Sequence, residues 1–107
     1  MLKEIYDVMD EKQASNIVMI DFRLESSFYD YFIIASAKNH RMAISIIEAI
    51  EAKIKELGKD VRTIEGDKNS PWQLIDCYEV IVHIFLDDER ELYNLENLWS
   101  DLPRVKF

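Results

Sequence analysis

Residues 31–58 read YFIIASAKNH RMAISIIEAI EAKIKELG and carry the two clearest structural signals in the chain. Residues 31–35 are a short aromatic and β-branched run, which predicts a strand buried on both faces. Apolar residues then trace one face of a long amphipathic helix: Ala43, Ile46, Ile47, Ile50, Ile54 and Leu57. Asn39 is a suitable N-cap, and Gly58 stands where a left-handed residue ends many helices. A buried strand followed by such a helix predicts a sheet covered by helices.

Two further elements are expected before this unit. Residues 17–22 are a short run rich in β-branched residues and predict a strand. The polar, serine-containing residues 23–28 predict the loop that follows it. At the N-terminus, apolar residues at helical spacing predict a helix that ends near Ala14: Leu2, Ile5, Tyr6 and Met9.

Three more strands are expected after the long helix. Residues 61–65 favour a strand, and residues 66–71 contain a glycine and a proline that predict a loop. Residues 72–75 and 80–86 then predict a β-hairpin around the turn at residues 76–79.

The hairpin has an expected register. With a two-residue loop, Trp72 lies directly opposite His83, and Leu74 lies opposite Ile81. All four side chains then share one face of the sheet. The turn has no glycine, the residue favoured where φ is positive.

One final helix is expected at the C-terminal end. Asp88 can cap it, with Glu91 three residues further on in a pattern close to a capping box, and Pro103 ends it. Its apolar stripe consists of Leu92, Leu95, Trp99 and Leu102. The expected order is α-β-β-α-β-β-β-α, in a single domain of mixed α/β (α+β) class that spans residues 1–107.

Composition narrows the classes of function. Apolar residues make up 49 % of the 107, so a packed core is feasible. The formal net charge of −8 repels nucleic-acid phosphates and anionic lipid and attracts basic partners. No apolar stretch is long enough to span a bilayer, no signal peptide is evident, and the single cysteine excludes an internal disulfide. These features predict a reducing, cytoplasmic setting without direct nucleic-acid or membrane contact.

An enzymatic alternative depends on His83. A histidine on a strand can act as a general base, with Asp76 or Glu65 as its orienting acid, in a hydrolytic or nucleotidyltransferase-like enzyme. More often such a histidine hydrogen-bonds a neighbour and holds a hairpin in place. With only two glycines the chain has no phosphate-binding loop. Acidic neighbours would raise the pKa of Cys77 and weaken it as a nucleophile, so we expect no catalytic site.

No metal or cofactor site is expected. Two histidines and one cysteine are too few for a structural zinc site. The acidic run at residues 87–89 does not have the spacing of a metal-binding loop. Carboxylates at the start of a helix are explained by the helix dipole.

Aromatic and leucine side chains gather at the start of the hairpin and in the last helix. The set consists of Trp72, Leu92, Tyr93, Leu95, Leu98 and Trp99. In the helix it covers a wider arc than the roughly 100° that a core-facing stripe needs. The apolar residues outside that arc either form an exposed patch that binds a protein partner or are large side chains that fill a small core. Composition and spacing leave both open.

Several motifs in order resemble the ribosomal silencing factor family, also called the Iojap-like family. They are DYFIIA at residues 30–35, Glu65 with Gly66, Trp72 followed by Asp76, VIVHI at residues 80–84, and Arg90 with the YxLExLW pattern at residues 93–99. Each motif alone is weak, but their order and spacing make the resemblance strong from about residue 2 to residue 100.

The resemblance implies a function without catalysis or cofactor. Members of the family bind the large ribosomal subunit through large ribosomal subunit protein fourteen. They sterically block association with the small subunit and so repress translation when nutrients are scarce. They are often homodimers in isolation. Their fold is a mixed five-stranded sheet with helices, related to nucleotidyltransferases but without the catalytic site.

The same resemblance implies a set of site residues. The partner-binding positions that this chain keeps are Trp72, Tyr93, Leu95, Leu98 and Trp99. Asp76 and His83 match family positions around the hairpin, and we expect them to be structural or at the edge of the interface. The chain departs from the family pattern at Ala37, at Arg41–Met42 and at the hairpin turn. None of these departures removes the aromatic set.

Overall fold

Helices and strands follow the predicted order as far as the hairpin. A computed structural model describes the backbone of residues 1–107 and every side chain except those of Leu92, Tyr93, Leu95 and Glu96. The elements are α1 (Leu2–Glu11), β1 (Ser15–Asp21), β2 (Tyr31–Ala37), α2 (His40–Glu56), β3 (Thr63–Glu65), β4 (Trp72–Asp76), β5 (Val80–Leu86), α3 (Arg90–Tyr93) and α4 (Leu95–Leu98).

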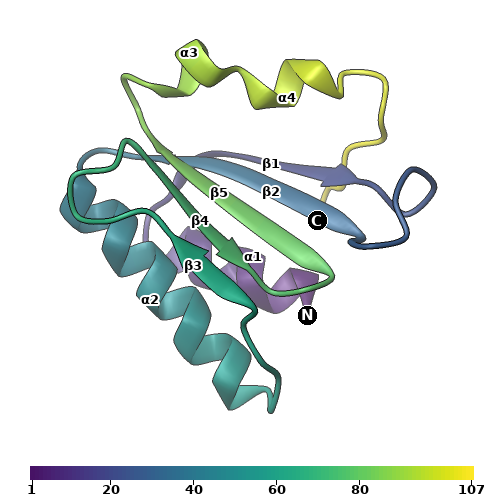
Figure 1. The fold of residues 1–107 in the computed structure, drawn as a ribbon, viewed down its shortest axis with the longest axis horizontal. Helices are drawn as coiled ribbons and strands as arrows, with labels where there is room; N and C mark the ends of the chain where they lie inside the picture. Colours follow the sequence, from purple (N-terminus) through teal and green to yellow (C-terminus); the bar gives the residue numbers. More distant parts are fainter.

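The five strands form one mixed sheet in the order β1-β2-β5-β4-β3 (Figure 1). β2 and β5 pair in parallel, and every other neighbouring pair is antiparallel. Parallel strands need a crossover connection, and the chain makes it through α2 and the β3–β4 pair. The predicted mixed five-stranded sheet in a single α+β domain is confirmed.

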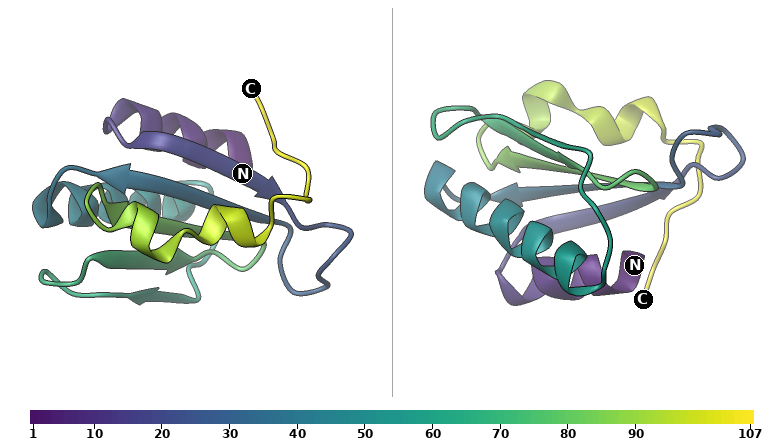
Figure 2. Two further views of the ribbon diagram at one scale, coloured as in Figure 1. Left: turned by 90° about the horizontal axis from the view of Figure 1, so that it is seen from above. Right: turned by 60° about the horizontal axis from the view of Figure 1, so that its bottom comes forward.

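The sheet separates two apolar layers. α1 and α2 cover one face, and α3 and α4 lie on the opposite side (Figure 2). We call the side that faces α1 and α2 the inner face and the other side the outer face. The inner core is largely aliphatic and contains Ile33, Ile50 and Ile84, whereas the outer core contains three phenylalanines: Phe22, Phe32 and Phe85.

α2 has the predicted boundaries and buried stripe. The side chain of Asn39 accepts a hydrogen bond from the backbone N–H of Met42 at 2.8 Å, which caps the first turn. Gly58 follows the helix with a φ of 75°, a conformation that glycine adopts without steric cost. The predicted stripe is buried from Ala43 to Ile54, and Leu57 at the C-cap is more exposed.

β2 is buried on both faces, as predicted. Phe32 and Ile34 belong to the outer core, whereas Ile33 and Ala35 belong to the inner core. The strand pairs with β1 on one side and with β5 on the other. It therefore needs apolar side chains at successive positions rather than an alternating pattern.

The C-terminal segment covers the free edge of β1. The backbone N–H of Asp21 donates to the carbonyl of Pro103, and that of Val105 donates to the carbonyl of Met19, both at 2.9 Å. An uncovered edge strand is a template for pairing with another chain. Backbone pairing with the chain's own last residues removes that template along part of β1.

The register of the β4–β5 hairpin differs from the prediction by two residues. Trp72 lies opposite Phe85 rather than His83, and Leu74 lies opposite His83 rather than Ile81. Side chains alternate between faces with a period of two, so a shift of two residues keeps each on its predicted face. Trp72 and His83 remain on one face, as diagonal neighbours.

The register differs from the prediction because the ladder of backbone hydrogen bonds continues one residue past β4. The backbone N–H of Cys77 donates to the carbonyl of Val80 at 2.9 Å, which leaves residues 78–79 as the loop. Tyr78 has a φ of 70°, and its N–H donates to the Asp76 carboxylate at 2.8 Å. Without a glycine, nothing in the sequence marks the residue that adopts the positive φ.

The prediction of a single final helix is wrong. α3 and α4 are separated at Asn94, whose φ of 48° is left-handed and interrupts the helix. Glu89 rather than Asp88 precedes the first turn, and none of the described side chains caps it. Trp99 and Leu102 pack against the outer core beyond α4. That burial favours a broken segment over one continuous helix, since tertiary packing overrides weak local propensity.

Smaller differences occur at the ends of two elements. α1 ends at Glu11, about three residues before the predicted end, and Gln13 has a φ of 66°. β3 is shorter than the predicted strand because only residues 63–65 pair with β4. Neither difference changes which face an apolar side chain occupies.

Candidate partner-binding face

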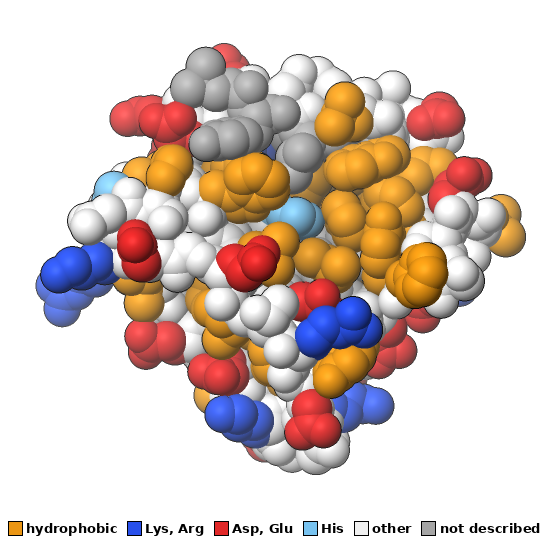
Figure 3. Space-filling model, in the orientation of Figure 1, with side chains coloured by type: hydrophobic (Ala, Val, Ile, Leu, Met, Phe, Trp, Pro, Cys, Tyr) orange, Lys and Arg blue, Asp and Glu red, His pale blue; other side chains and the backbone are white. Residues whose placement is uncertain are grey.

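The candidate site lies on the outer face of β4 and β5, opposite the side of the sheet that α2 covers (Figure 1). Trp72 and Leu74 reach this face from β4, and Ile81 and His83 reach it from β5. Hydrophobic side chains gather over the middle of this face in the space-filling view (Figure 3). An apolar surface of this kind is typical of protein–protein interaction sites.

Trp72 is held by two neighbours on β5. Its ring stacks on Phe85 with the centroids 5.0 Å apart and the planes 28° from parallel. Its indole Nε1–H donates to Nδ1 of His83 at 3.1 Å. The side chain is half-buried, so part of the ring remains open to a partner. A tryptophan fixed in one orientation loses little conformational entropy on binding.

His83 is a buried neutral histidine. Its side chain is 5 % exposed, and burial lowers its pKa to about 4. Because Nδ1 accepts the hydrogen bond from Trp72, the proton of the neutral ring sits on Nε2. That Nε2–H is buried and has no hydrogen-bond partner among the side chains that the structure describes. His83 therefore orients Trp72 at the cost of one unsatisfied donor.

The structure does not bring Asp76 or Glu65 to His83. The Asp76 carboxylate accepts from the N–H of Tyr78, and its other oxygen lies 3.9 Å from Nε of Arg62. Glu65 is exposed on β3. With Nδ1 occupied by Trp72 and the pKa far below neutral, His83 has no orienting acid among the described side chains and lacks the basicity of a general base.

The remaining candidate nucleophile faces away from this site. Cys77 is buried in the inner core, and burial together with the Asp76 charge raises the pKa of its thiol to about 12. A thiol with such a pKa carries almost no thiolate at neutral pH. The outer face is therefore suited to binding rather than to nucleophilic chemistry.

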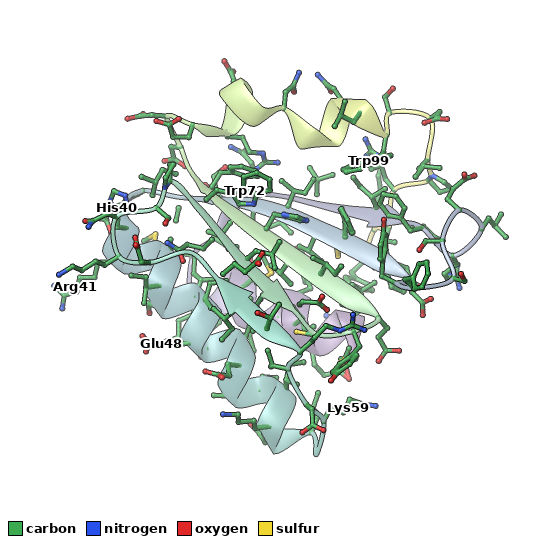
Figure 4. All side chains as sticks on the ribbon, in the orientation of Figure 1. His40, Arg41, Glu48, Lys59, Trp72 and Trp99 are labelled. Carbon is green, nitrogen blue, oxygen red and sulfur yellow. The ribbon has the colours of Figure 1, made fainter. Side chains whose placement is uncertain are left out.

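Trp99 lies on the same face as Trp72, further along the sheet (Figure 4). Its ring contacts Phe22 and Phe32 edge-on, with centroids 5.1 Å away in both cases. Phe32 in turn contacts His83 at 4.9 Å. A continuous series of rings thus joins Trp72 to Trp99 through His83 and Phe32, so these two predicted partner-binding residues belong to one surface.

Of the other predicted partner-binding residues, the structure describes the side chain of Leu98 but not those of Tyr93 and Leu95. Leu98 is 68 % exposed at the end of α4, beside Trp99. Tyr93 and Leu95 lie outside the described side chains. Arg90 anchors the start of this segment, since its Nη1 donates to the hydroxyl of Ser36 on β2 at 2.8 Å.

Sequence reasoning predicted a loop at residues 23–28 but did not assign it to the site, where it borders Trp99. A pocket of about 370 Å³ lies between this loop and the end of α4; its lining includes Phe22, Glu25, Tyr29, Leu98 and Trp99. Leu24 and Phe28 in the same loop are 95 % and 83 % exposed. The available signal was the pair of large apolar residues within a stretch that is otherwise polar.

Acidic side chains border the site. Asp87 and Asp88 are exposed in the turn between β5 and α3, as expected of charges at the rim of an interface. In the part of the chain that the structure describes, no group of His, Cys, Asp and Glu side chains is placed to hold a metal ion. None of the described helices combines the length and apolar character needed to cross a bilayer.

The fold and the site define a small α+β domain with an aromatic outer sheet face and no assembled catalytic group among the described side chains. Comparison with known proteins gives the particular family. The chain belongs to the family described as ribosomal silencing factor during starvation, whose model matches residues 1–107. The sequence motifs that resemble the ribosomal silencing factor family are thus those of a family that regulates translation.

Individual relatives agree with this assignment. The ribosomal silencing factor of Bacillus subtilis is 36 % identical over 103 residues, which cover 96 % of this chain and 87 % of that protein. A crystal structure of a Bacillus halodurans protein superposes with a TM-score of 0.86 at 31 % identity and covers 99 % of this chain and 96 % of that one. A mouse protein named for mitochondrial assembly of the ribosomal large subunit is 26 % identical over 99 residues, which span 90 % of this chain but 43 % of that protein.

Proposed function

We propose that this chain binds the large ribosomal subunit through large ribosomal subunit protein fourteen, using the outer face. The bound chain occupies a surface that the small subunit needs, blocks association of the subunits and represses translation under nutrient limitation. It acts in the cytoplasm. No catalysis and no cofactor take part in this mechanism.

The observation that carries the proposal is the arrangement of Trp72. In a chain of the ribosomal silencing factor family, this ring is half-buried, stacked on Phe85 and oriented by His83 on the outer face. Tryptophan is enriched among the residues that dominate binding energy at interfaces. Leu98 and Trp99 extend the same apolar surface.

Charge complementarity supports a protein partner that is basic. The net charge of −8 disfavours direct contact with ribosomal RNA, whereas acidic rim residues attract a basic ribosomal protein. Asp87 and Asp88 lie beside the outer face and are exposed. They accelerate encounter while the apolar centre supplies most of the affinity.

Sedimentation of purified large and small ribosomal subunits through a sucrose gradient tests the proposal. We expect the chain to travel with the large subunit and to lower the fraction of joined ribosomes. If it stays at the top of the gradient at low salt while the subunits join normally, the proposed function is wrong. Sedimentation of the chain alone tests whether it is a homodimer in isolation.

A charged substitution locates the binding surface. Leu98→Glu puts a carboxylate at an exposed position of the proposed interface, so it should leave the fold intact and abolish co-sedimentation. Leu57→Glu is the matched control, because Leu57 is 38 % exposed at the C-terminal end of α2 on the other side of the sheet. Loss of binding in both variants, or in neither, contradicts the assignment of the outer face.

A further inference from the structure

A second recess lies away from the outer face, beside the start of α2. It is a pocket of about 500 Å³. Its lining consists of His40, Arg41, Ile44, Ser45, Glu48 and Lys68. The first five come from one side of α2, and Lys68 comes from the loop between β3 and β4. His40, Arg41 and Glu48 are seen in this order along the helix (Figure 4).

An apolar recess adjoins this pocket. It has a volume of about 220 Å³ and shares Ile44, Glu48 and Lys68 with the first pocket. Ile47 and Ile64 add aliphatic surface, and Ile64 on β3 is 39 % exposed. The two recesses form one groove with a polar end near the N-terminus of α2 and an apolar end against β3.

The polar end is cationic in a chain that is strongly acidic overall. Arg41 and Lys68 are exposed, and neither forms an ion pair among the described side chains. The acidic groups nearby are Glu48, which is exposed in the groove, and Asp67. The Asp67 carboxylate already accepts hydrogen bonds from the N–H of Asn69 and the hydroxyl of Ser70, at 2.8 and 3.1 Å.

The start of α2 adds to this positive end. The Asn39 side chain satisfies the backbone N–H of Met42, and the N–H groups of the residues before it have no acceptor within the helix. The positive end of the helix dipole also points toward this end of the groove. Arg41, Lys68 and the helix terminus together favour an anion, and a phosphate group is the usual biological one.

We propose that this groove binds a nucleotide. The phosphate groups lie between Arg41, Lys68 and the first turn of α2, and the base lies against Ile44 and Ile64. The Glu48 carboxylate stands between the two ends, where it accepts hydrogen bonds from ribose hydroxyl groups. The site is separate from the outer face, so it adds a small-molecule ligand to the proposed ribosome-binding function.

The geometry favours a ligand that carries both a phosphate group and a flat ring. A cationic pocket alone would select any phosphate, and an apolar recess alone would select any flat ring. Their continuity through Ile44, Glu48 and Lys68 favours a molecule that carries both at a short separation. The combined volume is in the range of small-molecule sites.

Calorimetric titration of the full chain with ADP, GDP, CDP and UDP tests the proposal, in the absence of added metal ions. Adenosine and inorganic phosphate serve as the partial ligands. We expect at least one nucleotide to bind saturably and roughly tenfold more tightly than either partial ligand. Absence of saturable binding by all four in the millimolar range would overturn the proposal, and so would equal binding of inorganic phosphate.

Three variants locate the site. Arg41→Gln and Lys68→Gln change exposed side chains, so the fold should persist, and each should weaken nucleotide binding by about tenfold or more. Lys59→Gln is the control, since it removes the same charge from an exposed lysine beyond the other end of α2 (Figure 4). An equal loss in all three variants would mean non-specific attraction and would overturn the site.

A further substitution tests the apolar end. Ile64→Glu places a charge where the base is proposed to lie, and it should weaken binding of the nucleotide but not of inorganic phosphate. Unchanged nucleotide affinity in this variant would overturn the proposed orientation. Subunit sedimentation with the same variant should stay normal, which separates failure of this site from failure of the outer face.

Discussion

At the scale of single residues, His83 connects the stability of the fold to the orientation of Trp72. Burial lowers the pKa of His83 from 6.5 to about 4, so the ring stays neutral in the folded chain at pH values where it is protonated in the unfolded chain. The neutral ring accepts the indole N–H through Nδ1. Protonation would add a second donor at Nδ1 and break that hydrogen bond.

The lowered pKa predicts a loss of stability at acidic pH. Between pH 6.5 and about 4 the unfolded chain binds more protons at His83 than the folded chain, so unfolding becomes easier as the pH falls through this window. The stability that is lost through His83 reaches about 3 kcal/mol below pH 4. Urea unfolding of the wild type and of His83→Gln across this range measures it, and the variant should lose less stability.

The second histidine provides the control for this prediction. His40 lies at the start of α2, on the surface of the groove, and is less buried than His83. His40→Gln should therefore keep the steep decline of the wild type. Equal declines in the wild type and His83→Gln would show that carboxylates, not His83, cause the effect.

A second residue-scale prediction concerns Trp72. Trp72→Ala should weaken binding to isolated large ribosomal subunit protein fourteen by about 2 kcal/mol, because a half-buried tryptophan on an open face is a typical hot spot. Surface plasmon resonance measures the affinity. Phe107→Ala is the control, since Phe107 is 60 % exposed and packs on Tyr6 of α1, on the other side of the sheet.

This prediction has two ways to fail. Circular dichroism that shows Trp72→Ala to be unfolded would make Trp72 a core residue rather than an anchor. An unchanged affinity in a folded Trp72→Ala variant would leave the outer face without its main contact. Trp72→Phe separates the ring from the indole N–H, because it keeps the stacking on Phe85 and loses the bond to His83.

At the scale of elements, α2 contributes five buried residues to the inner core. Ile50 is fully buried in its middle, against the inner core. Ile50→Ala should lower the free energy of unfolding by about 2–5 kcal/mol, through lost apolar contact and the cavity left behind. Glu51→Ala on the same helix removes only a surface ion pair with Lys55 and should cost under about 0.5 kcal/mol. Thermal unfolding of both variants compares them, and similar costs would contradict the assigned core.

The break between α3 and α4 gives a second element-scale prediction. Asn94 has a left-handed conformation that alanine adopts only at a cost of about 1–2 kcal/mol. Asn94→Ala should therefore destabilise the fold by about that amount, and Asn94→Gly should be neutral or stabilising. Chemical unfolding measures both. Increased helicity and stability in Asn94→Ala would show that one continuous helix is the preferred state.

At the scale of the whole molecule, charge governs how the chain meets a partner. With a net charge of −8, association with a basic ribosomal protein should slow several-fold as ionic strength rises from roughly 0.05 to 0.5 M, while dissociation changes little. Stopped-flow measurement with isolated large ribosomal subunit protein fourteen separates the two rates. Association that accelerates with salt would contradict electrostatic attraction and the proposed role of Asp87 and Asp88.

The architecture explains why one small domain can present two different surfaces. α1 and α2 bury the aliphatic inner face, so the aromatic outer face and the outer side of α2 are left for ligands. The C-terminal segment covers the edge of β1 and leads the chain back across the sheet. Each surface therefore has its own set of residues, and a variant in one should leave the other intact.

The amino-acid sequence by itself determined the elements that depend on neighbours a few positions away. The stripe of α2, its Asn39 cap and the doubly buried β2 follow from local periodicity and were predicted. The face occupied by Trp72 and His83 also followed, because alternation survives a register shift of two residues. The family motifs pointed to the same aromatic set.

Only the tertiary structure decided what depends on contacts between distant parts of the chain. The position of β5 between β2 and β4, the break at Asn94 and the hydrogen bond from Trp72 to His83 all require packing across the sheet. So does the groove, which needs Lys68 to lie beside α2. Local sequence sets backbone preferences of about a kilocalorie per mole, whereas burial of a whole side chain is worth several, so packing decides wherever the two compete.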